Sequence, residues 1–98
     1  MTSYRYKVVY SNKFKKNLKK VKKQGKDLSK LLDIVDKLAY REKLDFNLYD
    51  HILRNNKYFK GCRECHIEPD WLLVYKYEDD KLILLLVDTG SHSEVLNI

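Results

Sequence analysis

The chain has 98 residues, of which 44% are hydrophobic and 12% aromatic, with 20 Lys and Arg against 14 Asp and Glu. This length fits one domain spanning residues 1–98, and the apolar fraction is too high for a disordered chain. The longest aliphatic run covers residues 82–87, whereas a membrane-spanning helix needs roughly 20 apolar residues. Because residues 1–7 also lack the apolar stretch of a secretory signal, we expect a cytoplasmic protein with no membrane partner.

Positive charge is concentrated in the first half of the chain. Residues 1–43 carry a net charge of +10, whereas residues 44–98 carry −4. Eight lysines and no acidic residue fall within residues 13–26. This density predicts salt-dependent attraction to a polyanion, although a solvated helix face would give the same pattern. We favour a nucleic acid, bound by Lys15, Lys16, Lys19, Lys20, Lys22 and Lys23.

The N-terminal half predicts a strand and two helices. Residues 4–10 are rich in aromatic and β-branched side chains, which is typical of a strand. Ser11 or Asn12 then caps a helix that Gly25 ends. Its apolar stripe consists of Phe14, Leu18 and Val21. A second helix, which completes a helical hairpin, begins near Asp27 and should bury Leu28, Leu31, Leu32, Val35, Leu38 and Ala39.

The second half predicts an antiparallel sheet. Residues 44–60 have no sustained period and suggest a loop with one short extended piece. Three strands follow, separated by turn residues, at 62–67, 71–78 and 81–88. We therefore expect an α+β fold in which the N-terminal strand and this three-stranded meander belong to a single sheet. Both helices of the hairpin should pack on one face of that sheet. The other face would be free for a ligand.

The segment Cys62-Arg63-Glu64-Cys65-His66 matches the C-x-x-C-H pattern of covalent haem attachment, and its cysteine pair would also suit zinc or a redox role. In a strand, however, side chains three positions apart point to opposite faces. Cys62 and Cys65 should therefore not converge on one metal ion or haem. We expect two small apolar residues of a half-buried strand, no metal and no cofactor.

The three histidines, His51, His66 and His92, all lie outside the helical hairpin, at strand ends or in loops beside polar residues. One such histidine would usually be a surface or capping residue, but three in the sheet half favour a shared site. Two imidazoles beside a phosphodiester can act as general base and general acid. Asp70 could orient a histidine or accept a proton, or it could only close the turn that follows Pro69.

Three segments carry a resemblance to a known family. Residues 61–76 read GCRECHIEPDWLLVYK, residues 50–53 read DHIL, and residues 90–93 read GSHS. Together they resemble a YafQ-type toxin of the RelE/ParE superfamily, and the likeness extends over the whole chain. It implies a RelE-like fold and a bacterial type II toxin that enters the ribosomal A site and cleaves the mRNA there. It also implies inhibition by a cognate antitoxin, through which alone operator DNA would be bound.

The family's catalytic residues match His51, His66, Asp70 and His92 of this chain. The resemblance implies an endoribonuclease that works without a metal. The ribose 2′-OH loses a proton, the phosphorane charge is held and the 5′-oxygen gains a proton, which leaves a 2′,3′-cyclic phosphate and a 5′-OH. We expect His66 with Asp70 on the base side, His92 as the acid, and His51 supporting either.

Three further residues concern RNA binding. Trp71 matches a family position where an aromatic face would stack on an unpaired base, although it would equally serve as a core residue. Arg63 is the nearest guanidinium for a phosphate, but strand alternation places it opposite His66 unless a bulge intervenes. Leu96 stands where family members often carry an aromatic residue, and it would stack less well.

Two other functions stay open. A superfamily relative could act by binding a protein, as the gyrase-poisoning branch does, and a basic module could bind RNA through its lysines alone. Replacing the histidines separates the ribonuclease from both. In the ribonuclease, the lysines would dock the toxin on ribosomal RNA, and an acidic antitoxin segment would neutralise the basic half.

Overall fold

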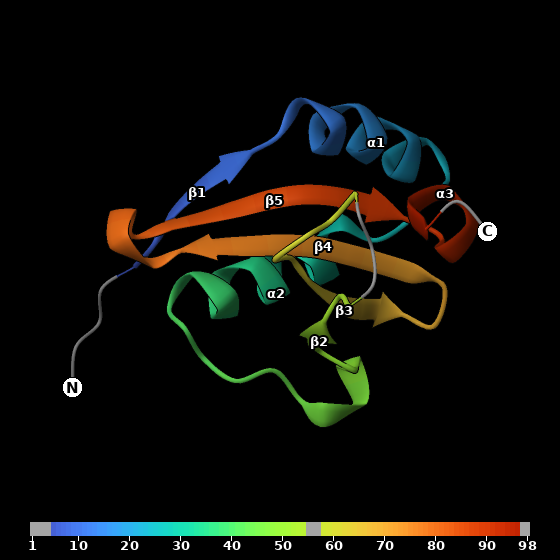
Figure 1. Ribbon diagram of the computed structural model, residues 1–98. Coiled ribbons are helices and arrows are strands. Elements are labelled where there is room, and N and C mark those ends of the chain that lie inside the picture. Colours follow the sequence, from blue (N-terminus) through green and yellow to red (C-terminus); the bar gives the residue numbers. More distant parts are fainter. Residues whose placement is uncertain (1–4, 55–57, 97–98) are drawn as a thin grey trace.

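The computed structural model describes residues 5–54 and 58–96 of the chain. Within these residues the strands form a five-stranded sheet in the order β1-β5-β4-β3-β2 (Figure 1). The strands are Lys7–Tyr10 (β1), His51–Ile52 (β2), Arg63–Glu68 (β3), Trp71–Glu78 (β4) and Ile83–Gly90 (β5). The first strand pairs parallel to β5, and the other pairs are antiparallel. The expected α+β class and meander are confirmed. The start of the predicted first strand, at Tyr4, lies outside the described residues.

Helix α1 (Asn12–Lys23) begins and ends where its sequence predicted. The Ser11 side chain accepts a hydrogen bond from the Phe14 backbone N–H at 3.0 Å and so satisfies a donor that the first turn leaves unpaired. After the helix, Gly25 adopts a φ of +80°, which glycine reaches without the steric cost that a Cβ imposes. Phe14 and Val21 are buried, so the apolar stripe faces the core.

Helix α2 (Leu28–Ala39) is capped at its N-terminus by Asp27, whose carboxylate accepts from the Ser29 backbone N–H at 3.0 Å. One prediction was wrong here, because Leu32 is 60% exposed and Ile34, which we had not included, is buried. Leu32 lies at the flank of the apolar stripe, whereas Ile34 is closer to its centre. The buried face of α2 is Leu31, Ile34, Val35, Leu38 and Ala39.

Two hydrophobic clusters lie on opposite faces of the sheet. On β4, Leu73 and Tyr75 pack in the cluster that α1 and α2 cover, whereas Leu72 and Val74 pack in a second cluster. Both long helices therefore cover one face, as expected. The other face is not entirely free, since Phe59 and the short helix α3 (His92–Leu96) cover part of it. No helix among the described residues is long and apolar enough to cross a membrane.

The end of α1 provides a test of the fold. No heavy atom lies within 4 Å of a Cβ built on Gly25, so replacing it with alanine costs backbone strain alone. We expect Gly25→Ala to lower the free energy of unfolding by about 1 kcal/mol, which lowers the melting temperature by about 4–8 °C. Gly25→Asn should cost less, because asparagine tolerates positive φ better. Equal melting temperatures for the two variants, measured by circular dichroism, would contradict a left-handed residue here.

Candidate active site

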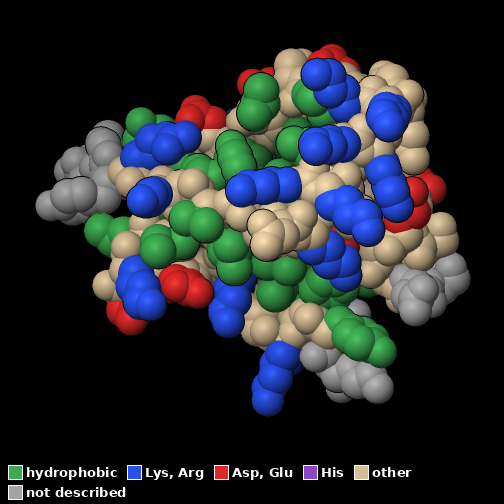
Figure 2. Space-filling view, turned by 90° about the horizontal axis from the view of Figure 1, so that it is seen from above, with side chains coloured by type: hydrophobic (Ala, Val, Ile, Leu, Met, Phe, Trp, Pro, Cys, Tyr) green, Lys and Arg blue, Asp and Glu red, His purple; other side chains and the backbone are tan. Residues whose placement is uncertain are grey.

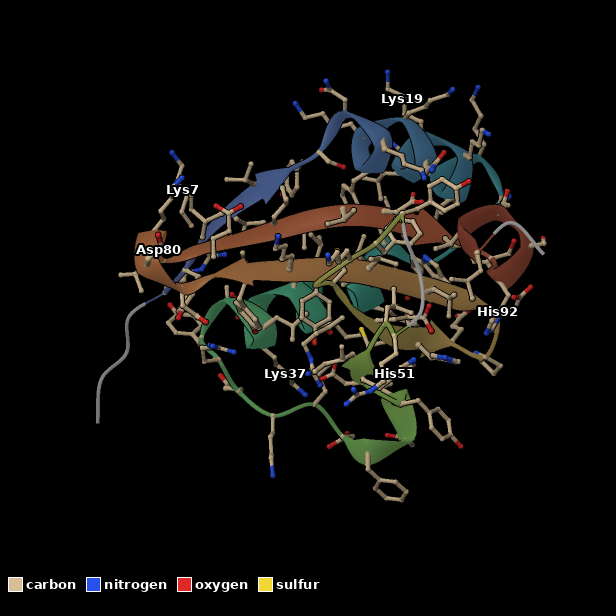
Figure 3. All side chains as sticks on the ribbon, viewed as in Figure 1. Lys7, Lys19, Lys37, His51, Asp80 and His92 are labelled. Carbon is tan, nitrogen blue, oxygen red and sulfur yellow. The ribbon has the colours of Figure 1, made fainter. Side chains whose placement is uncertain are left out.

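The structure brings the three histidines together in a row. Figure 3 labels its two ends, His51 and His92. The ring of His66, on β3, lies 5.1 Å from that of His92 and 6.5 Å from that of His51, centroid to centroid. His51 comes from β2, and His92 is the first residue of α3. The His51 side chain is 50% exposed, that of His92 36% and that of His66 20%. We call these three side chains the histidine row.

A buried carboxyl group lies beneath the row. Glu64 is the cross-strand partner of His51 and stands two positions before His66, so all three side chains share one face of the sheet. Its Oε1 lies 3.6 Å from Nε2 of His51 and 3.5 Å from Nε2 of His66, and the residue is only 3% exposed. Its Oε2 is buried without a hydrogen-bond partner among the described residues. Glu64 was not among the site residues that we predicted from the sequence. Its i, i+2 spacing from His66 was the available signal.

Asp70 holds His92 rather than His66, which corrects the pairing that we expected. One carboxylate oxygen accepts from the His92 backbone N–H at 2.9 Å and contacts the ring Nδ1 at 2.6 Å. These two hydrogen bonds, the backbone one foremost, lower the pKa of Asp70 below its usual value. The register explains the contact, because Leu72 pairs with Gly90 and thereby places the residues just before β4 beside those just after β5. Proximity in sequence had suggested His66 instead.

The backbone at His92 is fixed by a reciprocal cap. The Ser91 N–H donates to the Glu94 carboxylate at 2.9 Å, and the Glu94 N–H donates to the Ser91 hydroxyl at 3.2 Å. Gly90, with a φ of +151°, makes room for this arrangement, since a Cβ there would lie 3.2 Å from a Glu94 carboxylate oxygen. Asp70 and the cap therefore hold His92 from both sides.

The position of His51 depends on its two neighbours. Its Nδ1 lies 2.6 Å from the Tyr49 carbonyl oxygen. On the opposite face of the sheet, Asp50 accepts from Arg63 at 3.3 Å (Nε) and 3.2 Å (Nη2) and also from the Tyr75 hydroxyl. Burial, followed by this contact with Asp50, raises the pKa of Tyr75. Arg63 is thus engaged away from the histidine row, on the face where strand alternation predicted it.

Neither of the two predicted stacking positions offers an aromatic face. Trp71 is 1% exposed and its indole N–H donates to the Thr89 hydroxyl at 3.0 Å, so the core alternative applies to it. Leu96 is half-buried and packs on the second hydrophobic cluster. The structure instead brings Tyr49 to the row, with its ring centroid 5.4 Å from that of His66. Tyr49 was not among the residues that we predicted from the sequence.

The two cysteines lie on opposite faces of the sheet, as alternation predicted. Cys65 belongs to the cluster under the long helices and Cys62 to the second cluster, and both thiols are free and buried. Burial is the main cause that raises the pKa of Cys65 to about 12, which makes it a poor source of thiolate. Both side chains contribute to packing.

The predicted lysines lie apart from the histidine row. All six are exposed, and the space-filling view shows Lys and Arg side chains gathered over α1 with no histidine in view (Figure 2). Lys19 likewise points away from the sheet above α1, whereas His51 and His92 lie below β5, near β2 and α3 (Figure 3). The molecule therefore has a basic helix surface and a separate histidine site.

Known proteins resemble this chain over most of its length. A model of the family described as YafQ, a bacterial toxin of type II toxin–antitoxin systems, matches residues 6–97. The mRNA interferase toxin YafQ of Escherichia coli strain B is 36% identical over 87 residues, which make up 88% of this chain and 90% of that protein.

Solved structures agree in fold. A metal-bound toxin from Helicobacter pylori is 41% identical with a TM-score of 0.85, over 92% of this chain and 98% of that one. The E. coli DinJ–YafQ complex contains a chain that is 35% identical with a TM-score of 0.81, over 93% of this chain and 98% of that one. The chain therefore belongs to the YafQ family of bacterial toxins from type II toxin–antitoxin systems.

Proposed function

We propose that this toxin is an endoribonuclease that cleaves mRNA in the ribosomal A site by general acid–base chemistry, without a metal ion at the reacting groups. The observation that carries the proposal is the histidine row, in which the rings of His51, His66 and His92 adjoin one another above Glu64 and beside Asp70. The family membership supports it, since the E. coli relative is named an mRNA interferase.

His92 is suited to be the general acid. Asp70 is an ionised acceptor, so the Nδ1–H of His92 donates a hydrogen bond to it. The other ring nitrogen, Nε2, remains for the substrate. In the charged ring, Nε2 carries the proton that the 5′-oxygen needs as it leaves, and the Asp70 carboxylate stabilises that charge. After the transfer, the hydrogen bond to Asp70 retains the neutral ring in the Nδ1–H form.

His66 is suited to be the base that takes the proton of the ribose 2′-OH. When His66 gains that proton, its ring becomes positively charged. The Glu64 carboxyl lies 3.5 Å from Nε2 of this ring and stabilises the charge. Because the rings of His66 and His92 are in contact, the scissile phosphate lies against their exposed edges rather than between them. His51 extends this edge and supports the charge of the phosphorane.

Two partners complete the proposal. The exposed lysines of α1 dock the toxin on ribosomal RNA, through contacts that position it without reading sequence. A cognate antitoxin holds the toxin inactive, as the DinJ–YafQ complex of E. coli suggests, and it alone contacts operator DNA. An mRNA substrate on ribosomes implies that the toxin acts in the cytoplasm.

The proposal is tested first by primer extension on a defined mRNA, with and without programmed ribosomes. We expect cleavage only with ribosomes, and a loss of at least about 100-fold in His92→Gln, because the variant lacks the general acid. A 2′-deoxy nucleotide at the cleavage position should block the reaction. A phosphorothioate there should not be rescued by manganese or cadmium if no metal takes part. If the unsubstituted toxin makes no cut, a protein-binding toxin becomes the better account.

Glu64 provides a second test. Glu64→Gln keeps the size of the side chain but replaces the carboxyl group that faces His51 and His66 by an amide, so we expect single-turnover cleavage to slow by about tenfold or more. The fold should survive, because one oxygen of Glu64 already lacks a partner among the described residues. Glu42→Gln, at an exposed position beyond α2, is the matched control and should cleave at the unsubstituted rate. Equal rates for both variants would contradict the role of Glu64.

The lysine surface is tested through salt dependence. Replacing Lys15, Lys16, Lys19 and Lys20 by glutamine should weaken binding to ribosomes and flatten the plot of log affinity against log salt concentration. The slope should fall by up to about 0.7–0.9 for each phosphate that the toxin no longer neutralises. Replacing the exposed Lys7, Lys37, Lys43 and Lys81 removes the same charge elsewhere and should flatten the plot less. The same slope for both sets would mean that net charge alone matters.

A further inference from the structure

The ring of Tyr49 is a solvent-exposed aromatic surface within the histidine site. Tyr49 is 64% exposed, and its ring meets that of His66 at 60° with a centroid separation of 5.4 Å. Nearby, Asn47, Tyr49, His66 and Pro69 help to line a hollow of about 420 Å³. An open aromatic face therefore adjoins both a hollow and the histidine that we propose as the base.

The backbone of Tyr49 is in a conformation that a bulky residue rarely adopts. Its φ is +51° and its ψ is +43°, the left-handed region in which a residue with a Cβ costs about 1–2 kcal/mol. Glycine or asparagine would end the short 3₁₀ helix Phe46–Leu48 at a lower cost. Such conformations cluster at functional sites. A tyrosine here, solvated and strained, adds little to the core, which points to a role in binding.

We propose that Tyr49 is the stacking platform for an mRNA base next to the scissile phosphate, an inference that rests on the proposed ribonuclease function. An unpaired base stacks readily on an exposed aromatic ring. With its base on Tyr49, a nucleotide holds its ribose and phosphate over His66. Trp71 is buried and Leu96 is aliphatic, so neither of those positions supplies this face.

The hollow beside Tyr49 gives the base room and one polar contact. The exposed Asn47 side chain lines it together with Leu48, and a side-chain amide offers both a donor and an acceptor to a base edge. Glu68 lies on the same rim but is already paired with Lys26 at 3.2 Å and Lys30 at 2.9 Å. The surface thus combines an apolar ring with an amide, as base recognition requires.

The test is a double-mutant cycle between Tyr49 and the base. Single-turnover cleavage on programmed ribosomes is measured for the unsubstituted toxin and for Tyr49→Leu, on mRNA with an intact base or an abasic site at each position of the A-site codon in turn. Tyr49→Leu should lower kcat/KM about tenfold on the intact mRNA. At one codon position the abasic site should slow the unsubstituted toxin equally but have no further effect on Tyr49→Leu.

The controls separate stacking from other roles of Tyr49. Tyr49→Phe keeps the ring and should keep the sensitivity to the abasic site at that codon position, whereas Tyr40→Leu, a change at another exposed tyrosine, should cleave at the unsubstituted rate. Strictly additive losses at every codon position would overturn the proposal and leave Tyr49 as a support for His66. Unchanged cleavage by Tyr49→Leu with weakened antitoxin binding would also overturn it and assign the ring to the protein partner. If the unsubstituted toxin cleaves nothing, the ribonuclease itself fails, and the stacking role fails with it.

Discussion

The position of the histidine row depends on the register of the short pairing between β2 and β3. Because successive side chains of a strand point to opposite faces, a slip of one residue would exchange His51 with Asp50 and carry the imidazole to the helix-covered face. Two residues of β2 provide little pairing of their own. Asp50 secures the register from the far side through Arg63 and Tyr75. Asp50 therefore fixes the position of its neighbour His51, which we propose as part of the active site.

Sequence patterns predicted most of the fold, because helix caps, apolar stripes and turn residues are local signals. The gathering of the histidines was also predictable, since all three fall in the sheet half. The partner of Asp70 was not, because the pairing of β4 with β5 brings it to His92 from 22 positions away. The place of Glu64 could not be predicted, because it depends on the β2–β3 register and the sequence of residues 44–60 has no sustained period. Tyr49 needed a left-handed backbone that no sequence rule assigns to tyrosine.

The basic surface of α1 and the histidine row lie on different parts of the molecule. The lysines of α1 are exposed on the outer side of a helix whose inner side packs on β5. The histidine row lies on the opposite face of the sheet, because His66 alternates along β3 with the helix-covered Cys65 and Ile67. In the proposed function, attraction to a polyanion and proton transfer at the phosphate therefore belong to different surfaces. The sheet fixes the positions of these two surfaces relative to each other. This arrangement agrees with the proposed action inside a much larger RNA assembly.

The parallel pairing of β1 with β5 has a consequence for how the toxin is made. Among the described strands, its first strand pairs only with residues 83–86, and Ser11 reaches Val87 across 76 positions of the chain. A chain that emerges from the ribosome N-terminus first can form its helices early, but the sheet closes late. His92 comes later still, just after β5. On the proposed mechanism, the growing chain therefore lacks its general acid until β5 has been made.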